Sequence, residues 1–244
     1  MPTSAQTYTA GIKDRCSSWG ADLAGIADVE PLKALRLSPP DLLDRFARAV
    51  SLAVQLPLAV FDTISTQPTP IYSAVYKTAN QILDQIALRC AVALQEDGYR
   101  SLPIPASQIL DRKRLYGAIS HKAVARMAGL GWQGKNLLLI TPRYGSRVRL
   151  VTVLTEAPLE VDGPITNRCG KCTHCQASCP VDAIKGVPTQ SHYDRRNDAV
   201  DMARCAGHLT TRFQDLPHIG APICGICIKA CPFSRKRPSR PPAP

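Results

Sequence analysis

The placement of the cysteines constrains this chain more than any other feature. Eight of the ten fall into two runs near the C-terminus. The first run reads C-x2-C-x2-C-x3-C-P, and the second reads C and then, after a longer gap, C-x2-C-x3-C-P. They comprise Cys169, Cys172, Cys175 and Cys179, followed by Cys205, Cys224, Cys227 and Cys231. When only two residues separate successive cysteines, one short loop can present several thiolates to a metal, so the runs predict a metal-binding domain.

The two reciprocal CP endings predict two [4Fe–4S] clusters. Each cube needs four thiolates, and in two-cluster ferredoxins the cysteine of each CP ending binds the other cube. The crossed assignment gives one cluster (cluster one) to Cys169, Cys172, Cys175 and Cys231. It gives the other (cluster two) to Cys179, Cys205, Cys224 and Cys227. Pro180 and Pro232 suit the first turn of a helix, which would bring backbone N–H groups near anionic sulfur.

Zinc and disulfides are the alternatives to iron–sulfur clusters. Paired CxxC steps also bind structural zinc, but zinc does not need the two reciprocal CP endings. Disulfides are disfavoured because the opening sequence, MPTSAQTYTAG, has no apolar secretory segment. We therefore expect a reducing, cytoplasmic location, in which thiols stay free for metal. The longest apolar run, 47–60, is broken by Arg48, Gln55 and Pro57, so we expect no membrane span.

The formal net charge of +11 limits the choice of partners only weakly. Bound clusters would lower it, because four thiolates outweigh the positive charge of the cube they hold. A basic, proline-rich tail at 236–244 ends the sequence. A basic surface is compatible with RNA or with an acidic, low-potential electron donor such as ferredoxin or flavodoxin. Aromatic residues make up only 5% of the chain, and no RNA-binding signature is present.

The residues before the cysteine runs predict an α/β domain at 1–161, followed by a ferredoxin-like double-cluster domain at 162–235. Helices are predicted at 7–19, 71–95 and 120–128. Strands are predicted at 22–27, 49–56, 137–141 and 147–155. A hairpin turn at 142–146 would join the last two strands. Strands that alternate with helices are typical of the α/β class.

The other two cysteines, Cys16 and Cys90, are predicted to be structural. Cys90 falls on the apolar face of the helix expected at 71–95, where a buried thiol behaves as a small hydrophobic group. That face comprises Ile71, Val75, Ala79, Ile82, Leu83, Ile86, Ala87, Cys90, Ala91 and Leu94. The helix expected at 120–128 would begin at Ser120, as N-cap, and stop at Gly129.

A second informative segment is GLGWQGKN at 129–136. Its three glycines let the backbone approach a cofactor, a phosphate or another part of the protein closely. The segment is not a Rossmann fingerprint, because its glycines follow a helix and precede a strand. Lys135 could neutralise a phosphate or the edge of a cofactor, and the alternative is a solvated loop lysine.

The order of these motifs resembles the epoxyqueuosine reductase family, which is related to the reductive dehalogenases. The resemblance rests on AGLGWQGKN, TPRYGSRVRL, CGKCTHCQASCP and CGICIKACPF, and on GADLAGIADVEPL near the start. It implies a nitroreductase-like α/β domain that binds cobalamin, and a double [4Fe–4S] domain that supplies single electrons for reduction of an epoxide or a carbon–halogen bond. The implied cofactor face comprises Ser120, Gly129, Gly131, Trp132, Gly134, Lys135 and Asn136. A flavin is the less favoured alternative cofactor.

Two departures from the family pattern concern the substrate. Epoxyqueuosine reductases carry an acidic residue fourteen positions before the first glycine of GLG, and here that position is Leu115, with Asp111 as the nearest acid. Tyr116, His121 or Lys122 could replace it as proton donor, although His121 could equally make a local hydrogen bond at a helix start. The chain also stops soon after the second run, without the helical repeats that long members use around tRNA. We therefore do not favour tRNA as a partner.

These features together predict an iron–sulfur oxidoreductase that passes electrons through two [4Fe–4S] clusters to cobalamin, where a substrate is reduced. The alternative is a ferredoxin-like electron-transfer protein with no substrate of its own, which serves a corrinoid protein or another enzyme. The Leu115 departure and the short length favour the alternative, whereas the intact glycine segment favours the reductase.

Overall fold

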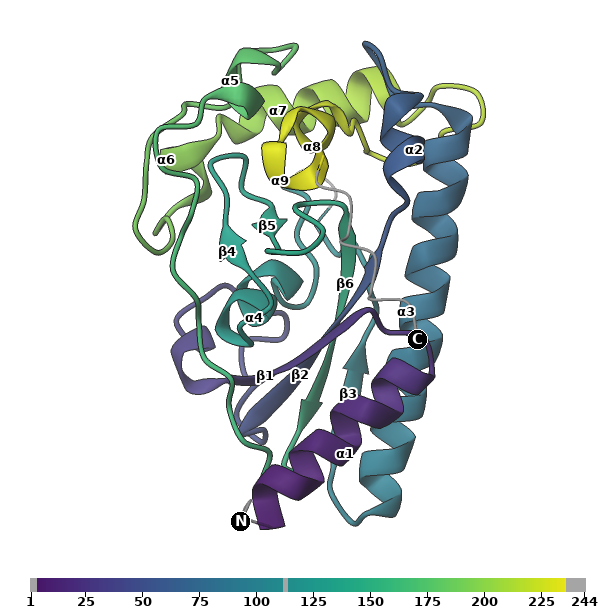
Figure 1. Cartoon of the computed structure of the whole chain (residues 1–244), viewed down its shortest axis with the longest axis vertical. Coiled ribbons are helices and arrows are strands. Elements are labelled where there is room, and N and C mark those ends of the chain that lie inside the picture. Colours follow the sequence, from purple (N-terminus) through teal and green to yellow (C-terminus); the bar gives the residue numbers. More distant parts are fainter. Residues whose placement is uncertain (1–3, 112–113, 236–244) are drawn as a thin grey trace, which may run out of the picture. The chain divides into compact units, whose positions relative to one another are not determined.

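The computed structural model describes residues 4–111 and 114–235, so the tail predicted at 236–244 lies outside the described residues. The chain divides into two compact units, whose elements are labelled in Figure 1. The first unit gathers the described parts of Met1–Gln55, Tyr76–Trp132 and Arg149–Thr166. The second gathers Leu56–Val75, Gln133–Val148 and the described part of Asn167–Pro244. The units are interleaved along the sequence, unlike the single boundary expected after residue 161, because two earlier segments pack with the cysteine-bearing one.

A four-stranded sheet in the order β1-β2-β6-β3 forms the centre of the first unit. Its strands are β1 (Leu23–Asp28), β2 (Arg48–Gln55), β3 (Ser101–Ile104) and β6 (Val148–Thr155). β1 pairs antiparallel with β2, with Ile26 opposite Val50, and β3 pairs antiparallel with β6, with Leu102 opposite Leu154. Pro103 lies in β3, which is an edge strand and therefore tolerates a residue without an N–H group.

Helices cover both faces of this sheet. α1 (Ser4–Ser18) and α3 (Pro70–Glu96) lie together on one face, where their apolar residues form the main core with β1, β2 and β6 (Figure 1). α4 (His121–Met127) lies against β1 and β2, and a Cβ built on Gly25 would be 2.2 Å from the carbonyl oxygen of Ala128. Because Gly25 and the core residue Ile26 point to opposite faces of β1, the end of α4 covers the second face.

The structure confirms most elements predicted for this part of the chain. The helices expected at 7–19, 71–95 and 120–128 and the strands expected at 22–27, 49–56 and 147–155 are present within a few residues. Cys16 and Cys90 are buried in the core, as predicted. The apolar face of α3 is narrower than predicted, because Ile71 and Ile82 are 57% and 36% exposed. A short 3-10 turn at Glu30–Leu32 was not predicted.

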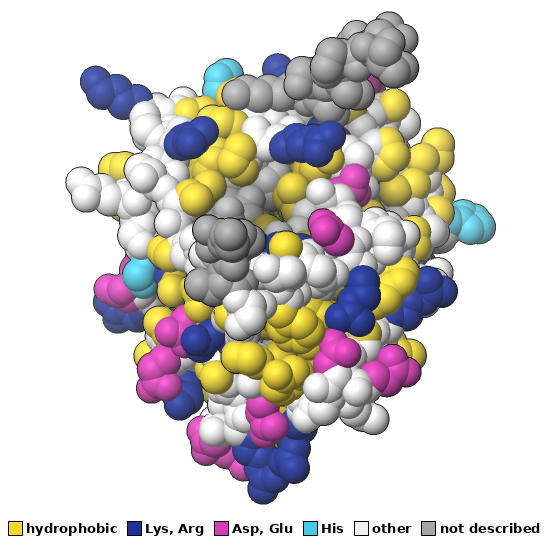
Figure 2. Space-filling view, turned by 60° about the horizontal axis from the view of Figure 1, so that its bottom comes forward, with side chains coloured by type: hydrophobic (Ala, Val, Ile, Leu, Met, Phe, Trp, Pro, Cys, Tyr) yellow, Lys and Arg dark blue, Asp and Glu magenta, His cyan; other side chains and the backbone are white. Residues whose placement is uncertain are grey.

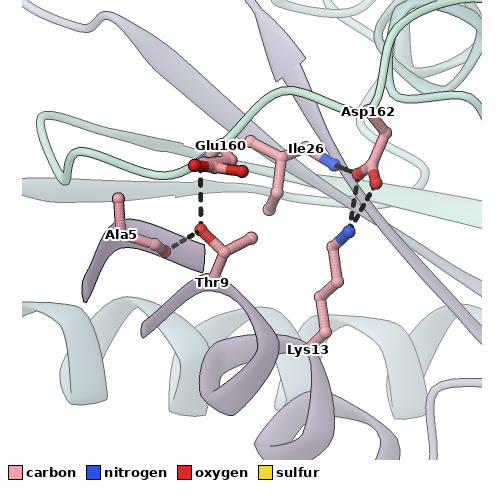
Figure 3. Close-up of polar contacts among 6 residues, drawn as sticks. All are labelled: Ala5, Thr9, Lys13, Ile26, Glu160 and Asp162. Atoms are coloured by element: carbon pink, nitrogen blue, oxygen red, sulfur yellow. Dashed lines mark hydrogen bonds and ion pairs between the residues drawn. The ribbon is translucent and has the colours of Figure 1, made fainter. Parts of the chain in front are cut away.

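The segment that follows β6 is fastened to α1 and β1, as Figure 3 shows. The hydroxyl oxygen of Thr9 accepts a hydrogen bond from the backbone N–H of Glu160 at 2.9 Å. One carboxylate oxygen of Asp162 accepts from the backbone N–H of Ile26 at 2.6 Å, and the other lies 2.6 Å from Lys13 Nζ. These bonds hold the last residues of the first unit against its sheet.

The second unit contains little regular strand. Its two-stranded sheet joins β4 (Trp132–Gln133) to β5 (Leu139–Ile140). Its helices are short: α2 (Leu58–Asp62), α5 (His174–Ala177), α6 (Arg196–Ala199), α7 (Met202–His208), a π-helical turn at Leu209–Phe213, α8 (Ile226–Ala230) and α9 (Pro232–Arg235). The strand pairing predicted between 137–141 and 147–155 is wrong, because β5 pairs with β4. The predicted turn is present, closed by backbone hydrogen bonds between Thr141 and Gly145 at 2.9 and 3.0 Å. Leu137 has a φ of +59°, which is incompatible with an extended strand at that position.

Exposed charges of both signs lie close together on the first unit, as in the pairs Arg15–Asp97 at 3.0 Å and Lys33–Glu30 at 2.7 Å. On the face shown in Figure 2, Lys and Arg side chains lie among Asp and Glu side chains and do not form one continuous basic surface. Within residues 4–111 and 114–235, no helix is both long enough and apolar enough to cross a membrane.

Candidate metal centre

Four cysteines from two segments surround one small void in the second unit. Its walls include Lys135, Asn136 and Ile140 besides Cys169, Cys172, Cys175 and Cys231. Cys169 and Cys172 belong to one tight turn, in which Cys172 N donates to Cys169 O at 3.1 Å. Cys231 arrives from the other cysteine run, one residue before α9 begins. The structure therefore brings together the four cysteines assigned to cluster one.

The remaining four cysteines also lie near one another. Burial, together with the nearby thiols of Cys205 and Cys179, raises the pKa of Cys224 to about 11. Burial raises the pKa of Cys227 as well, with contributions from the thiols of Cys224, Cys205, Cys175 and Cys179. The structure thus brings together the four cysteines assigned to cluster two. The two groups adjoin, because Cys175 and Cys227 pack against the same apolar cluster.

Two of the cysteines at the first void, Cys175 and Cys231, have pKa values raised by burial. Burial raises the pKa of Cys175 to about 11, and the thiols of Cys231, Cys169 and Cys172 add to the shift. Such thiols must lose their protons when they bind iron, so assembly of a cluster releases protons. No His, Cys, Asp and Glu side chains in the described ranges are grouped tightly enough for a single metal ion. A cube spreads its four thiolates over four irons, and this donor set of two groups of four thiols fits two cubes.

Local structure explains how Cys205 and the second run are positioned. The carboxylate of Asp201 caps α7 by accepting from Arg204 N at 3.1 Å, and Cys205 lies in the helix so formed. Gly225 begins α8 with a φ of +86°. A Cβ at Gly225 would lie 2.5 Å from Ile64 Cδ1, so glycine lets this cysteine loop approach the segment after α2 closely.

The two CP endings differ in structure. Pro232 begins α9, as predicted, whereas the prediction that Pro180 begins a helix is wrong. The residues after Cys179 form a turn, in which Asp182 N donates to Cys179 O at 3.2 Å and Asp182 has a φ of +48°. A residue in this left-handed conformation cannot continue a helix. The turn nevertheless brings a backbone N–H to the sulfur, because Ala183 N donates to Cys179 Sγ at 3.3 Å.

Several residues predicted for the cofactor face make contacts within the protein. Ser120 is the N-cap of α4, and its hydroxyl accepts from Ala123 N at 3.3 Å. Gly129 ends that helix with a φ of +71°, and a Cβ there would lie 2.7 Å from the carbonyl oxygen of Gly163. Trp132 is fully buried. The geometry of the two ends of α4 therefore explains why a serine stands at 120 and a glycine at 129.

Gly134 and the two residues after it belong to the surroundings of the first void. A Cβ at Gly134 would lie 2.5 Å from Ile140 Cδ1 and 2.7 Å from Asn136 Oδ1, so the glycine permits close packing here. Lys135 is only 5% exposed, and its Nζ donates to the carbonyl oxygen of Cys172 at 2.9 Å. The alternative of a solvated loop lysine is therefore wrong. Gly131, like its neighbours, is buried.

Asp111 and Tyr116 bracket the turn that contains Leu115, which has a φ of +54°. The backbone N–H of Arg114 donates to the carboxylate of Asp111 at 2.9 Å. This bond, with the guanidinium groups of Arg114 and Arg36, lowers the pKa of Asp111, so its carboxylate stays charged at neutral pH. The guanidinium of Arg36 also lies over the ring of Tyr116, 4.6 Å from its centroid.

His121 is held at both ring nitrogens by distant residues. Its Nε2 lies 3.0 Å from the carbonyl oxygen of Pro105 and must carry the proton, because a carbonyl only accepts. Its Nδ1 then accepts from the hydroxyl of Thr152 at 2.8 Å. Burial lowers the pKa of His121 to about 4. The expected local hydrogen bond at the helix start is thus replaced by two long-range ones, while Lys122 is exposed.

Asn167, which no motif singled out, orders the start of the first cysteine run. Its Oδ1 accepts from Cys169 N at 2.8 Å and its Nδ2 donates to the carbonyl oxygen of Gln133 at 2.8 Å. An asparagine two residues before a structured position is typical of an Asx turn, so the signal was present in the sequence. Its partner Gln133 could not be read from local sequence.

Comparisons with known proteins agree with the cysteine arrangement. Residues 168–234 match the family model described as a 4Fe-4S double cluster binding domain. The epoxyqueuosine reductase of Bacillus subtilis (strain 168) is 31% identical over 216 residues, which are 84% of this chain and 52% of that protein. The enzyme of Vibrio cholerae serotype O1 is 30% identical over 223 residues, 84% of this chain and 54% of that protein. The chain thus spans about half the length of these curated relatives.

Solved structures share the fold. A reductive dehalogenase, whose structure is described as suggesting a mechanism for B12-dependent dehalogenation, superposes with a TM-score of 0.74 at 21% identity, over 97% of this chain and 33% of that one. An epoxyqueuosine reductase with an epoxyqueuosine-modified tRNA-Tyr stem loop superposes with a TM-score of 0.62 at 24% identity, over 96% of this chain and 67% of that one. The chain is thus similar to epoxyqueuosine reductases over 84% of its own length, and its cysteine-bearing segment matches a 4Fe-4S double cluster binding domain.

Proposed function

We propose that this protein is an iron–sulfur reductase of the epoxyqueuosine reductase-like type, which delivers single electrons to cobalamin for reduction of a substrate. The observation that carries the proposal is the gathering of eight cysteines into two groups of four, in a chain that aligns over 84% of its length with epoxyqueuosine reductases. Two bound [4Fe–4S] clusters would supply one-electron chemistry at low potential. The same kinship disfavours the alternative of an electron-transfer protein without a substrate.

Kinship supports cobalamin more strongly than any local contact does. One structural neighbour is described in terms of B12-dependent dehalogenation. In this chain the Ser120 hydroxyl makes a hydrogen bond within the protein, and Gly129 and Gly134 lie against other protein atoms. These residues therefore do not form a site shaped for a cofactor. We therefore assign no residue to cobalamin contact. The comparisons give a flavin no support, and a nitroreductase-like origin of the α/β unit stays part of the proposal.

The proposed substrate is a small molecule or a modified nucleoside. The Bacillus subtilis relative is described with an aspartate-bearing catalytic loop that swings out of its active site. Here Leu115 stands at the corresponding family position, Asp111 is held charged, and His121 is neutral with both nitrogens occupied. This leaves Tyr116 and Lys122 as the candidates for proton donor. Since general acid catalysis contributes about 10²–10⁴-fold, we expect weak reduction of epoxyqueuosine.

The proposed partner is a low-potential electron donor of the ferredoxin or flavodoxin type. Such donors are acidic, and an acidic donor complements a chain with a formal net charge of +11. A relative has been solved with a modified tRNA stem loop, so tRNA is a second candidate partner. We do not favour tRNA, because aromatic residues make up only 5% of the chain and its sequence has no RNA-binding signature.

Anaerobic purification with metal analysis and absorption spectra tests the proposed function. We expect about eight irons and eight sulfides per chain. We also expect added cob(II)alamin to stay with the protein on gel filtration and to be reduced when a low-potential donor is supplied. Stoichiometric zinc with little sulfide would contradict the iron–sulfur assignment. Full clusters without retention of cobalamin would instead favour the electron-transfer alternative.

A further inference from the structure

Asn136 has a buried amide group whose donor end has no partner in the described protein. The side chain is only 8% exposed. Its Oδ1 accepts from the backbone N–H of Leu138 at 3.2 Å, and this contact fixes which end of the amide is oxygen, because a backbone N–H can only donate. Nδ2 is buried and makes no hydrogen bond with the residues that the structure describes. A buried N–H group without an acceptor lowers the stability of the folded protein, so we expect Nδ2 to donate to an acceptor that is bound at the void.

The surroundings of Asn136 identify the missing acceptor. Asn136 lines the same void as Cys169, Cys172, Cys175 and Cys231. Sulfur is the acceptor chemistry that these four side chains and a cluster between them would offer. Hydrogen bonds to sulfur are one of the factors that set the reduction potential of an iron–sulfur cluster.

Lys135 adds a charge at the same place. It lines the void beside Asn136, is 5% exposed, and reaches the carbonyl oxygen of Cys172 with one of its three N–H donors. Among the described residues that line the void, only Lys135 carries a cationic side chain. A buried cation near a cluster stabilises the added negative charge of the reduced state, and so favours reduction.

The second group of cysteines has a different environment. Cys179, Cys205 and Cys227 pack against an apolar cluster, which Cys175 of the first group also contacts. That cluster consists of Leu137, Ala183, Ile184, Ala199 and Val200. The side chains of this cluster carry neither an N–H donor nor a charge, and the bond from Ala183 N to Cys179 Sγ at 3.3 Å comes from the backbone. The cluster therefore holds no counterpart of the Lys135 charge or of the Asn136 amide.

We propose that Lys135 and Asn136 raise the reduction potential of cluster one above that of cluster two, Asn136 by donating its amide N–H to a sulfur of cluster one. This proposal rests on the proposed two-cluster function. The step concerned is the transfer of one electron from a low-potential one-electron donor, which is oxidised, to an oxidised [4Fe–4S]2+ cube, which is reduced to the 1+ state without bond formation or proton transfer. The electron would then reside preferentially on cluster one.

A redox titration followed by EPR tests the potential of each cluster in the complete protein. Asn136→Asp keeps the acceptor for Leu138 and removes the donor, and Asn136→Ala removes both. We expect both variants to lower the equilibrium constant for reducing cluster one by about tenfold, which is 59 mV for one electron, and to leave cluster two unchanged. Unchanged potentials in both variants, or equal shifts of both clusters, would overturn the proposal.

A charge-conserving pair of variants tests the lysine. Lys135→Met should lower the potential of cluster one, and Lys135→Arg should keep it near that of the wild type, because a guanidinium retains the positive charge. Equal potentials for the Met and Arg variants would show that the charge has no role.

A spectroscopic measurement on the unmutated protein makes the test independent of variants that fail to assemble. Protein labelled with 15N in asparagine side chains should show a nitrogen hyperfine coupling to the reduced cluster one in pulsed EPR. The absence of this coupling, with both clusters present by iron analysis, would refute the hydrogen bond. Absence of both clusters from the wild type would refute the proposed function itself, so the two failures can be distinguished.

Discussion

Gly134 offers a test of how closely the glycine segment must pack against the first void. In Gly134→Ala, the new Cβ would lie 2.5 Å from Ile140 Cδ1 and 2.7 Å from Asn136 Oδ1, whereas carbon atoms in ordinary contact are about 3.5–4.0 Å apart. The end of the isoleucine side chain can move, but the asparagine oxygen is held by Leu138 N at 3.2 Å. We therefore expect the change to displace Asn136 and to reduce the free energy of unfolding by about 1–3 kcal/mol.

Urea unfolding under anaerobic conditions would measure that free energy, and iron analysis with EPR would report the occupancy of cluster one. Gly11→Ala is the matched control, because nothing lies within 4 Å of a Cβ at that position in α1. It should be neutral or stabilise the helix by up to about 1 kcal/mol. A Gly134→Ala protein with the stability and the cluster one signal of the wild type would refute the packing argument.

Three further predictions follow from individual contacts. Cys231→Ala and Cys179→Ala should each lower the iron content from about eight to about four per chain, with loss of a different EPR signal in each variant, and loss of the same signal from both would refute the crossed assignment. His121 has a folded-state pKa of about 4, below the usual 6.5, so the unfolded chain binds the proton first and stability should fall by up to about 3 kcal/mol as the pH drops from 6.5 toward 4. His121→Gln should flatten this dependence in urea titrations at several pH values, and an unchanged slope would contradict it. Asp162→Ala should lower the free energy of unfolding by about 1–3 kcal/mol, because it leaves the backbone N–H of Ile26 in β1 without its acceptor. Lys13→Met, which removes only the ion pair, should lower it by less than about 1 kcal/mol. Equal losses in urea unfolding would show that the ion pair dominates.

Elements whose signal lies within a short stretch of sequence were predictable. The helix at Pro70–Glu96 follows from its apolar spacing, and the helix at His121–Met127 follows from the serine and glycine at its ends. β3 (Ser101–Ile104) was missed, because four residues that include Pro103 give no clear strand pattern. Its strand conformation depends on pairing with β6, a contact between segments about fifty residues apart.

The turn chemistry of the cysteine segment was only partly predictable. Pro232 begins a helix and Pro180 does not, although both follow a cysteine in the same local pattern. The difference arises at Asp182, whose left-handed conformation bends the chain back toward Cys179. Local sequence favours a turn after such a proline as readily as a helix, so packing around the sulfur makes the choice.

The sequence by itself determined which residues can carry the chemistry, because the cysteine spacing already contains the two groups of four and the crossing between them. Only the tertiary structure decided what surrounds each group. Lys135 and Asn136 precede Cys169, the first cysteine of the two runs, by more than thirty positions. Their place at the void depends on the close packing at Gly134 and on the hydrogen bond from Lys135 to Cys172. Such contacts arise when distant segments pack to bury apolar surface, and no local periodicity encodes them.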